Sequence, residues 1–259
     1  MEFRERPREF FWCRYIYYSE NIEKLGKVYF SIINGKERVD YYFWDSKTGK
    51  EKLRRVTNKN KEWNKYRTAA INRKLLKQKL KELINDYKKG WGGSLSEDAS
   101  HFRIVKNADN RFDSQLYSTF MNNQRGITDD HKFRYRGIPM CSEFETDIAG
   151  LIDDLDIAFK YEVKLDLNEF KCRYPDFALA FPEFNRCGFL EYLGALDNFS
   201  YVNKNSKKFE EYSNLGLYIG RDIVYVSGDD NYRPDKKLIR EMIMTMYAAI
   251  ARMHLIKVN

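Results

Sequence analysis

Two short apolar segments, residues 173–181 and 187–193, constrain the fold of this chain more than any other feature of its sequence. Each segment is typical of a β-strand, and the turn-type sequence P-E-F-N-R connects them. Each also carries one carboxylate, Asp176 in the first and Glu191 in the second. A carboxylate among apolar neighbours is costly to bury unless it is paired or binds a metal ion. The two strands are therefore predicted to hold a divalent-metal site.

The expected metal is Mg²⁺, with Mn²⁺ as an alternative, because hard cations prefer oxygen ligands such as these two carboxylates. A divalent ion that polarises a phosphate and activates water, beside a cationic group, is what phosphodiester hydrolysis requires. In isolation, Asp176 after Pro175 is also typical of a turn residue. Its pairing with Glu191 in a second apolar strand favours the metal site.

The sequence around these strands predicts an α/β domain with a mixed sheet and helices on both faces. Ser142 and Glu145 form the S-x-x-E pattern of a capping box and open a helix. The other expected elements are a strand at 158–167, a helix closed at Gly216, a strand at 222–228 and a helix starting near Pro234.

The N-terminal part predicts a β-meander followed by a long helix. Asn34-Gly35 between two β-rich segments is a strong hairpin signal, so residues 27–56 are expected to form three strands. Apolar residues at helical spacing predict one helix over residues 60–89. Residues 1–20 suggest an edge strand or docking arm. Residues 91–137 look like an irregular linker, which divides the chain into domains at 1–90 and 138–259.

Positive charge is concentrated between Glu51 and Gly90, where 14 Lys and Arg face 4 Asp and Glu, a net charge of +10 against +8 for the whole chain. One interpretation is a solvated helix face with lysine stems over apolar surface. The other is a surface that follows a phosphate backbone. The candidate nucleic-acid-binding residues are Lys52, Arg54, Arg55, Arg67, Arg73, Lys74 and Lys77.

Other functional classes find little support. The four cysteines and three histidines show no zinc-binding spacing, so we expect neither a zinc site nor a disulfide framework, and no catalytic role for His101, His131 or His254. The charged N-terminus does not resemble a signal peptide, and no apolar run approaches about 18 residues. A soluble, cytoplasmic protein without a membrane partner is expected, with nucleic acid as the first candidate partner.

The residues at the two strands resemble the PD-(D/E)XK nuclease superfamily, which has the restriction-endonuclease-like fold. The resemblance starts from P-D at 175–176 and E-Y-L at 191–193. It extends over residues 138–228 to a subgroup of uncharacterised prokaryotic and phage-type proteins. Its further matches are S-E at 142–143, Y-E at 161–162, Y-P-D-F at 174–177, E-Y-L-G at 191–194, Asp197, Tyr201, Lys208 and Tyr212.

The resemblance implies catalytic roles for four residues. Asp176 and Glu191 would bind the metal, and Glu143 would be a third acid on the preceding helix. Leu193 occupies the usual lysine position, so the resemblance assigns the lysine to Lys208 on the following helix, as in superfamily members that have moved it. Lys204 and Lys207 compete with Lys208 for this role, and Lys208 is alternatively one more surface lysine.

The acidic residues also have structural interpretations. Glu145 is expected to be only the capping-box partner of Ser142. Glu143 is alternatively an exposed acid in the first turn of a helix. Glu162 is expected to pair with Lys160 or Lys164 along its strand.

Together these features predict a Mg²⁺-dependent nuclease that acts on DNA rather than RNA. The alternative is a nuclease fold that has lost or nearly lost catalysis and binds nucleic acid or protein. A third hypothesis is a mobile-element or defence protein that engages a partner protein through its N-terminal region. Homodimer formation is compatible with each, but no dimer surface can be identified in the sequence.

Overall fold

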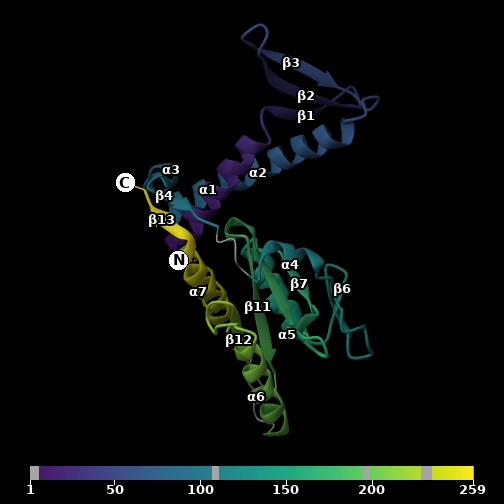
Figure 1. The fold of residues 1–259 in the computed structure, drawn as a ribbon, viewed down its shortest axis with the longest axis vertical. Helices are drawn as coiled ribbons and strands as arrows, with labels where there is room; N and C mark the ends of the chain where they lie inside the picture. Colours follow the sequence, from purple (N-terminus) through teal and green to yellow (C-terminus); the bar gives the residue numbers. More distant parts are fainter. Residues whose placement is uncertain (1–5, 107–110, 195–198, 229–234, 259) are drawn as a thin grey trace. The chain divides into compact units, whose positions relative to one another are not determined.

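The computed structural model describes residues 6–106, 111–194, 199–228 and 235–258, excluding the side chains of residues 199–202 and 204. The chain divides into two compact units, one centred on Phe11–Arg103 and the other on Ile104–Ile256 (Figure 1). It is a mixed α/β structure with several small sheets. None of its described helices is both long and apolar enough to cross a membrane.

The predicted meander in the first unit is confirmed. Strands β1 (Val28–Ile33), β2 (Lys36–Asp45) and β3 (Lys50–Val56) form an antiparallel sheet in that order. Asn34 and Gly35 both adopt positive φ, 49° and 73°, as a type I′ turn requires.

The predicted long helix is also confirmed, as α2 (Trp63–Gly90). Its residues Trp63 and Ala70 pack with Val28, Val39 and Val56 of the sheet in one buried cluster. One side of this small core therefore consists of alternate residues of the strands, and the other side consists of residues at helical spacing on α2.

The expected edge strand at the N-terminus is wrong, because α1 (Arg8–Lys24) is a helix. Phe11, Arg14 and Tyr18 are buried and follow the i, i+3, i+7 spacing of a helix face. The Arg14 guanidinium donates to the Tyr18 hydroxyl over 3.2 Å. The density of aromatic residues, which favours strands, hid this helical period.

The second unit contains a four-stranded mixed sheet in the order β12-β11-β10-β7. Strand β10 is antiparallel to β7 and β11, whereas β11 and β12 are parallel. Its strands are β7 (Phe159–Tyr161), β10 (Phe177–Phe181), β11 (Arg186–Leu193) and β12 (Ile223–Ser227). The main helices are α5 (Glu143–Asp154), α6 (Phe199–Asn214) and α7 (Lys236–His254).

The remaining elements are short, and several lie in the segment that the sequence suggests is an irregular linker. They are α3 (Leu95–Ser100), β4 (Phe102–Ile104), α4 (Ser114–Thr119), β5 (Phe133–Tyr135), β6 (Ile138–Met140), β8 (Leu165–Asn168), β9 (Lys171–Arg173), the 3₁₀-helix η2 (Pro182–Phe184) and β13 (Leu255–Lys257).

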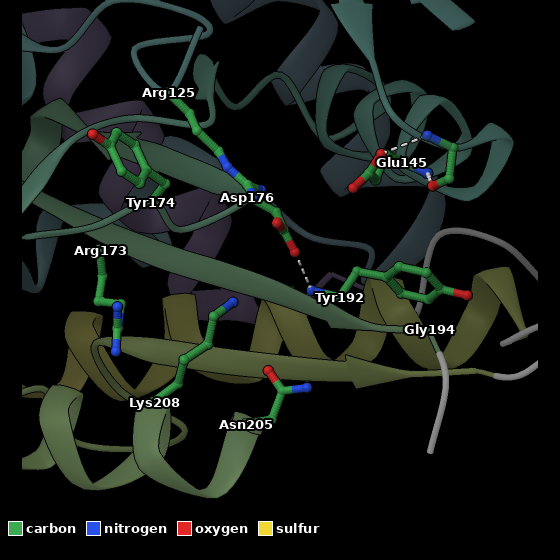
Figure 2. A pocket seen from close by; sticks show the side chains of 10 residues that line it. Arg125, Glu145, Arg173, Tyr174, Asp176, Tyr192, Gly194, Asn205 and Lys208 are labelled. Carbon is green, nitrogen blue, oxygen red and sulfur yellow. Dashed lines mark hydrogen bonds between the residues drawn. The ribbon is translucent and has the colours of Figure 1, made fainter. Parts of the chain in front are cut away.

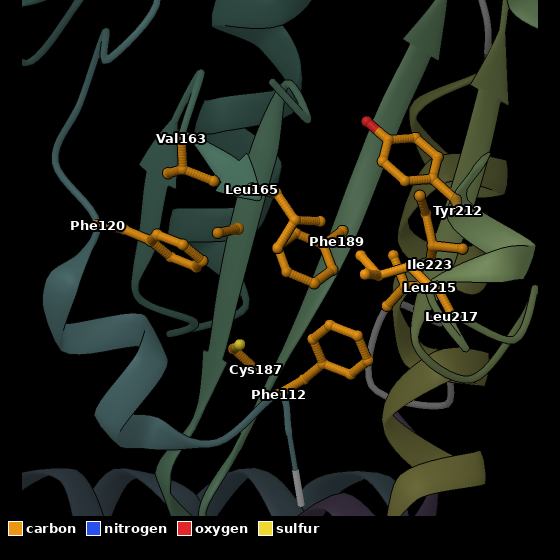
Figure 3. Close-up of a cluster of buried hydrophobic side chains, with 11 residues drawn as sticks. Phe112, Phe120, Val163, Leu165, Cys187, Phe189, Tyr212, Leu215, Leu217 and Ile223 are labelled. Carbon is orange, nitrogen blue, oxygen red and sulfur yellow. The ribbon is translucent and has the colours of Figure 1, made fainter. Parts of the chain in front are cut away.

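One face of the four-stranded sheet packs against α6 and the segment around α4 (Figure 3). Phe189 and Ile223 of the sheet contribute to this core, together with Phe112, Phe120 and Tyr212. Successive residues of a strand point to opposite faces, so Glu191, two residues after Phe189, also points toward α6.

Two predicted strands are interrupted. The strand expected at 158–167 divides into β7 and β8, because Glu162 adopts a left-handed φ of 46°. The strand expected at 173–181 divides into β9 and β10, with Pro175 between them. Proline cannot donate to a strand ladder, and this leaves Asp176 immediately before β10 rather than inside a strand.

Candidate active site

Strand pairing places Asp176 beside Glu191. Phe177 is opposite Leu190 in the antiparallel register of β10 and β11, so the preceding residue Asp176 lies next to Glu191. The Asp176 Oδ2 atom accepts a hydrogen bond from the Tyr192 backbone N–H over 2.6 Å. This bond fixes the orientation of the carboxylate at the end of β10.

The Glu191 carboxylate is completely buried and is held by two side chains of α6. Lys208 Nζ donates to Oε2 over 2.8 Å, and the Tyr212 hydroxyl donates to Oε1 over 2.5 Å. Lys208 and Tyr212 are four residues apart, which places them on one face of the helix. Burial, followed by the charge of Glu191, raises the pKa of Tyr212, so the hydroxyl keeps its proton and remains a donor.

The first turn of α5 contributes Glu145 rather than Glu143. The Glu145 side chain accepts from the Ser142 backbone N–H over 2.7 Å, and Ser142 Oγ accepts from the Glu145 N–H, so the predicted capping box is confirmed. Glu145 is buried and also lines the pocket described below, whereas Glu143 is exposed and does not line it. These residues are two positions apart on a helix and therefore point in different directions.

A cavity of about 550 Å³ opens beside these groups (Figure 2). It is lined by Arg125, Ser142, Glu145, Arg173, Tyr174, Asp176, Tyr192, Gly194, Asn205 and Lys208. In Figure 2 the Asp176 carboxylate lies between Glu145 and Lys208. Glu191 does not line the cavity and contacts it through Lys208.

The carboxylates are electrostatically coupled. Burial raises the pKa of Asp176 well above its usual value, the charges of Glu191 and Glu145 raise it further, and Lys208 opposes them. Burial also raises the pKa of Glu145. The positive charge near Asp176 and Glu145 therefore does not offset the free-energy cost of ionising these two carboxylates in their buried positions.

This charge deficit fits a divalent cation, which would favour the ionised carboxylates. Asp176 and Glu145 present oxygen ligands to the cavity, and Mg²⁺ typically uses one or two protein carboxylates together with several waters. Glu191 holds Lys208 in this arrangement rather than facing the cavity. Asp176 and Glu145 are therefore the two carboxylates of this cavity that could hold a metal ion, and Glu191 positions Lys208.

Two arginines on the cavity wall are residues that the sequence did not indicate. Arg173 donates to Glu211 Oε1 over 2.9 Å and is partly exposed. The Arg125 side chain is 64% exposed, and its guanidinium lies 3.7 Å from Glu162 Oε1. Arg125 belongs to a segment without sequence periodicity, so no local signal places it here.

A second group of potential metal ligands lies around Glu162. Ligand atoms of His131, Cys141 and Glu162 are within 4.8 Å of one another. The His131 Nδ1 atom accepts from the Thr128 backbone N–H over 3.0 Å, so the ring proton resides on Nε2 and points at Glu162 Oε2, 2.9 Å away. Burial raises the pKa of the Cys141 thiol. His131 and Glu162 thus form a hydrogen-bonded pair, and the protonated Cys141 thiol lies beside them.

The expected pairing of Glu162 with Lys160 or Lys164 is wrong. Lys164 Nζ lies 2.9 Å from Asp166, and Lys160 donates to the Tyr117 carbonyl oxygen over 3.0 Å. The left-handed backbone at Glu162 ends the strand alternation on which that expectation depended. His131, for which no catalytic role is expected, takes the place of the lysines.

Most of the candidate nucleic-acid-binding residues contact other groups in the first unit. Lys52 pairs with Asp45, Arg55 lies 3.5 Å from Asp40, and Arg67 binds Glu37 through two hydrogen bonds of 2.8 and 2.7 Å. Arg73 is buried, with its guanidinium 4.9 Å from the centre of the Tyr29 ring. Arg54, Lys74 and Lys77 are exposed.

Three residues that the sequence singles out lie partly or wholly outside the described part of the structure. Asp197 lies outside the described residues, and the side chains of Tyr201 and Lys204 are also outside them. Of the lysines that compete for the catalytic position, Lys207 is exposed and does not line the cavity.

Comparison with known proteins finds no matching family model, no matching curated protein and no matching solved structure. The functional assignment therefore depends on the chemistry of the cavity.

Proposed function

We propose that this protein is a Mg²⁺-dependent nuclease that hydrolyses phosphodiester bonds in DNA, on a restriction-endonuclease-like fold. The observation that carries the proposal is one cavity that combines Asp176 and Glu145 with the Glu191-anchored Lys208. Carboxylates that bind a hard cation, beside a fixed ammonium group, are the components that phosphodiester hydrolysis needs.

Each residue has a defined task. Asp176 and Glu145 would hold the ion, which supplies a Lewis acid and lowers the pKa of bound water. Lys208 would donate to the attacking water or to the scissile phosphate. Glu191 holds Lys208 in place, and Tyr212 in turn holds Glu191. Arg125 would offset phosphate charge at the cavity wall, because most of its side chain is exposed.

A cleavage assay on single- and double-stranded DNA and RNA, with Mg²⁺, Mn²⁺ or EDTA, tests this proposal. We expect metal-dependent cleavage of DNA that falls by about 100-fold or more in Asp176→Ala and Lys208→Ala. Glu169→Ala changes an exposed acid outside the cavity and should keep the parent rate. Full activity in Asp176→Ala, with circular dichroism of the folded protein, would overturn the site assignment.

A second candidate function is a binding module on the same fold without catalysis. Leu193 in the usual lysine position favours it, as does the engagement of both Glu191 oxygens by Lys208 and Tyr212. This candidate predicts DNA or partner-protein binding without cleavage in either metal. Loss of a partner when residues 1–90 are altered, but not in Asp176→Ala, would instead indicate recruitment of a protein.

A further inference from the structure

The three-stranded sheet of the first unit has an open face that none of the roles above uses. Val28, Val39 and Val56 point toward α2. Because side chains alternate along a strand, Tyr42 and Trp44 point away from the side on which Val39 meets α2, and the β2–β3 register places Tyr42 opposite Leu53 on that open side. Tyr29 lies on the edge strand β1, where its ring contacts both Tyr42 and Arg73 of α2. We call Tyr29, Tyr42, Trp44 and Leu53 the aromatic platform.

The platform is unusually exposed for such large side chains. Trp44 is 68% exposed, Leu53 48% and Tyr29 45%. The rings of Tyr29 and Tyr42 meet edge to face with their centres 5.8 Å apart, so the two tyrosines support each other while part of their surface stays open. Clustered exposed aromatic groups of this kind mark binding surfaces rather than random surface composition.

A cationic groove borders the platform at β1. It is a cavity of about 210 Å³ whose polar lining comes from Tyr29, Arg73, Lys74 and Lys77. The Arg73 guanidinium and the Lys77 ammonium lie 4.9 Å and 5.9 Å from the centre of the Tyr29 ring. Tyr29 therefore joins the two features, and the platform borders a groove lined by three cations.

The aromatic platform and the cationic groove together favour one class of ligand. Aromatic faces beside fixed positive charge suit a polyanion that carries flat, stackable groups, which describes a nucleic acid with exposed bases. Tyr42 and Trp44 are two residues apart on one strand, a separation of about 6.8 Å. Stacked bases in a duplex lie about 3.4 Å apart, so neighbouring rings of this platform match bases spread along an extended strand rather than a closed duplex.

We propose that the aromatic platform and the adjoining groove bind single-stranded DNA, with bases stacked on Tyr42 and Trp44 and phosphates along Arg73, Lys74 and Lys77. Because this site would present substrate to the nuclease, the assignment of single-stranded substrates rests on the function proposed above. Binding itself requires neither the metal nor Asp176.

Fluorescence anisotropy in EDTA tests the proposal, with the full chain and a labelled oligothymidylate of about 20 nucleotides beside a duplex of equal length. We expect the single strand to bind more tightly, and Trp44→Ala to weaken it by about 5- to 100-fold. Trp44→Phe should restore most of the affinity, because it retains a stacking face. Phe170→Ala is the matched control, since Phe170 is 95% exposed and belongs to the second unit.

Lys77→Ala should reduce the salt dependence of binding by about one counterion. Equal or tighter binding of the duplex, or an unchanged single-strand affinity in Trp44→Ala, would overturn the proposal. If single-strand binding depends on Trp44 but the protein cleaves no nucleic acid, this binding site is supported and the nuclease function is refuted. If the protein cleaves DNA in a metal-dependent way but Trp44→Ala does not change binding, the nuclease function is supported and this binding site is refuted.

Discussion

Replacing Lys208 by methionine should destabilise the second unit, because Glu191 would lose a charged hydrogen-bond donor in a buried position. Methionine keeps a long apolar stem and removes only the ammonium group. The Glu191 carboxylate is 0% exposed and would retain the Tyr212 hydroxyl at 2.5 Å, whereas its second oxygen would lose the donor at 2.8 Å.

The magnitude follows from the burial of the two partners. Breaking a fully buried ion pair costs about 3–5 kcal/mol, and a hydrogen bond to a charged group contributes about 1.5–3 kcal/mol. The Lys208 side chain is 26% exposed, so water can partly replace the ammonium group. We therefore expect a loss of about 2 kcal/mol in the free energy of unfolding.

Urea unfolding in EDTA at neutral pH measures this loss with an internal reference. All four tryptophans, Trp12, Trp44, Trp63 and Trp91, belong to the first unit. Tryptophan fluorescence should therefore report an unchanged first unit, while hydrogen exchange of peptides from β11 and α6 reports the loss. Lys207→Met, at an exposed neighbouring position, is the control and should match the parent.

A second substitution tests the cause. Adding Glu191→Gln to Lys208→Met removes the uncompensated charge and should recover part of the lost stability. The reasoning is refuted if Lys208→Met stays within about 0.5 kcal/mol of the parent, the usual range for surface substitutions. It is also refuted if the double variant is less stable than Lys208→Met alone.

Three further predictions concern the buried charges. The pKa of Asp176 is raised in the folded state, so its contribution to stability is fully present below the unfolded pKa of about 3.9 and is lost as pH rises toward the folded value. Asp176→Asn should therefore be more stable than the parent at neutral pH in EDTA, with the advantage shrinking toward about pH 4 in thermal unfolding. Glu145→Gln keeps a capping-box side chain but should lose Mg²⁺-dependent cleavage, whereas Glu143→Gln should retain it; the reverse result would restore Glu143 as the ligand. Asp222→Ala should destabilise the second unit by about 3–5 kcal/mol in urea, since it removes the carboxylate oxygen that accepts a 2.8 Å hydrogen bond from the buried Arg186, and a loss below about 1 kcal/mol would contradict this.

The sequence alone determined the elements whose signals are local. Hairpin chemistry at Asn34-Gly35, helical spacing in α2 and the capping box of α5 each depend on residues close in the chain, so their physical causes are visible without a fold. Adjacent apolar segments joined by a short turn likewise predicted that Asp176 and Glu191 lie side by side, although Asp176 comes immediately before β10 rather than inside a strand.

Tertiary structure decided which side chains meet. From the sequence, Glu145 was expected to serve only in the capping box, because that role depends on neighbouring residues. The packing of α5 also brings Glu145 to the cavity. The resemblance singled out Lys208, but only the fold shows it on Glu191, and only the fold places Arg125 at the cavity wall. Long-range packing and backbone irregularities, such as the left-handed Glu162, set these distances, and neither leaves a periodic signal in the sequence.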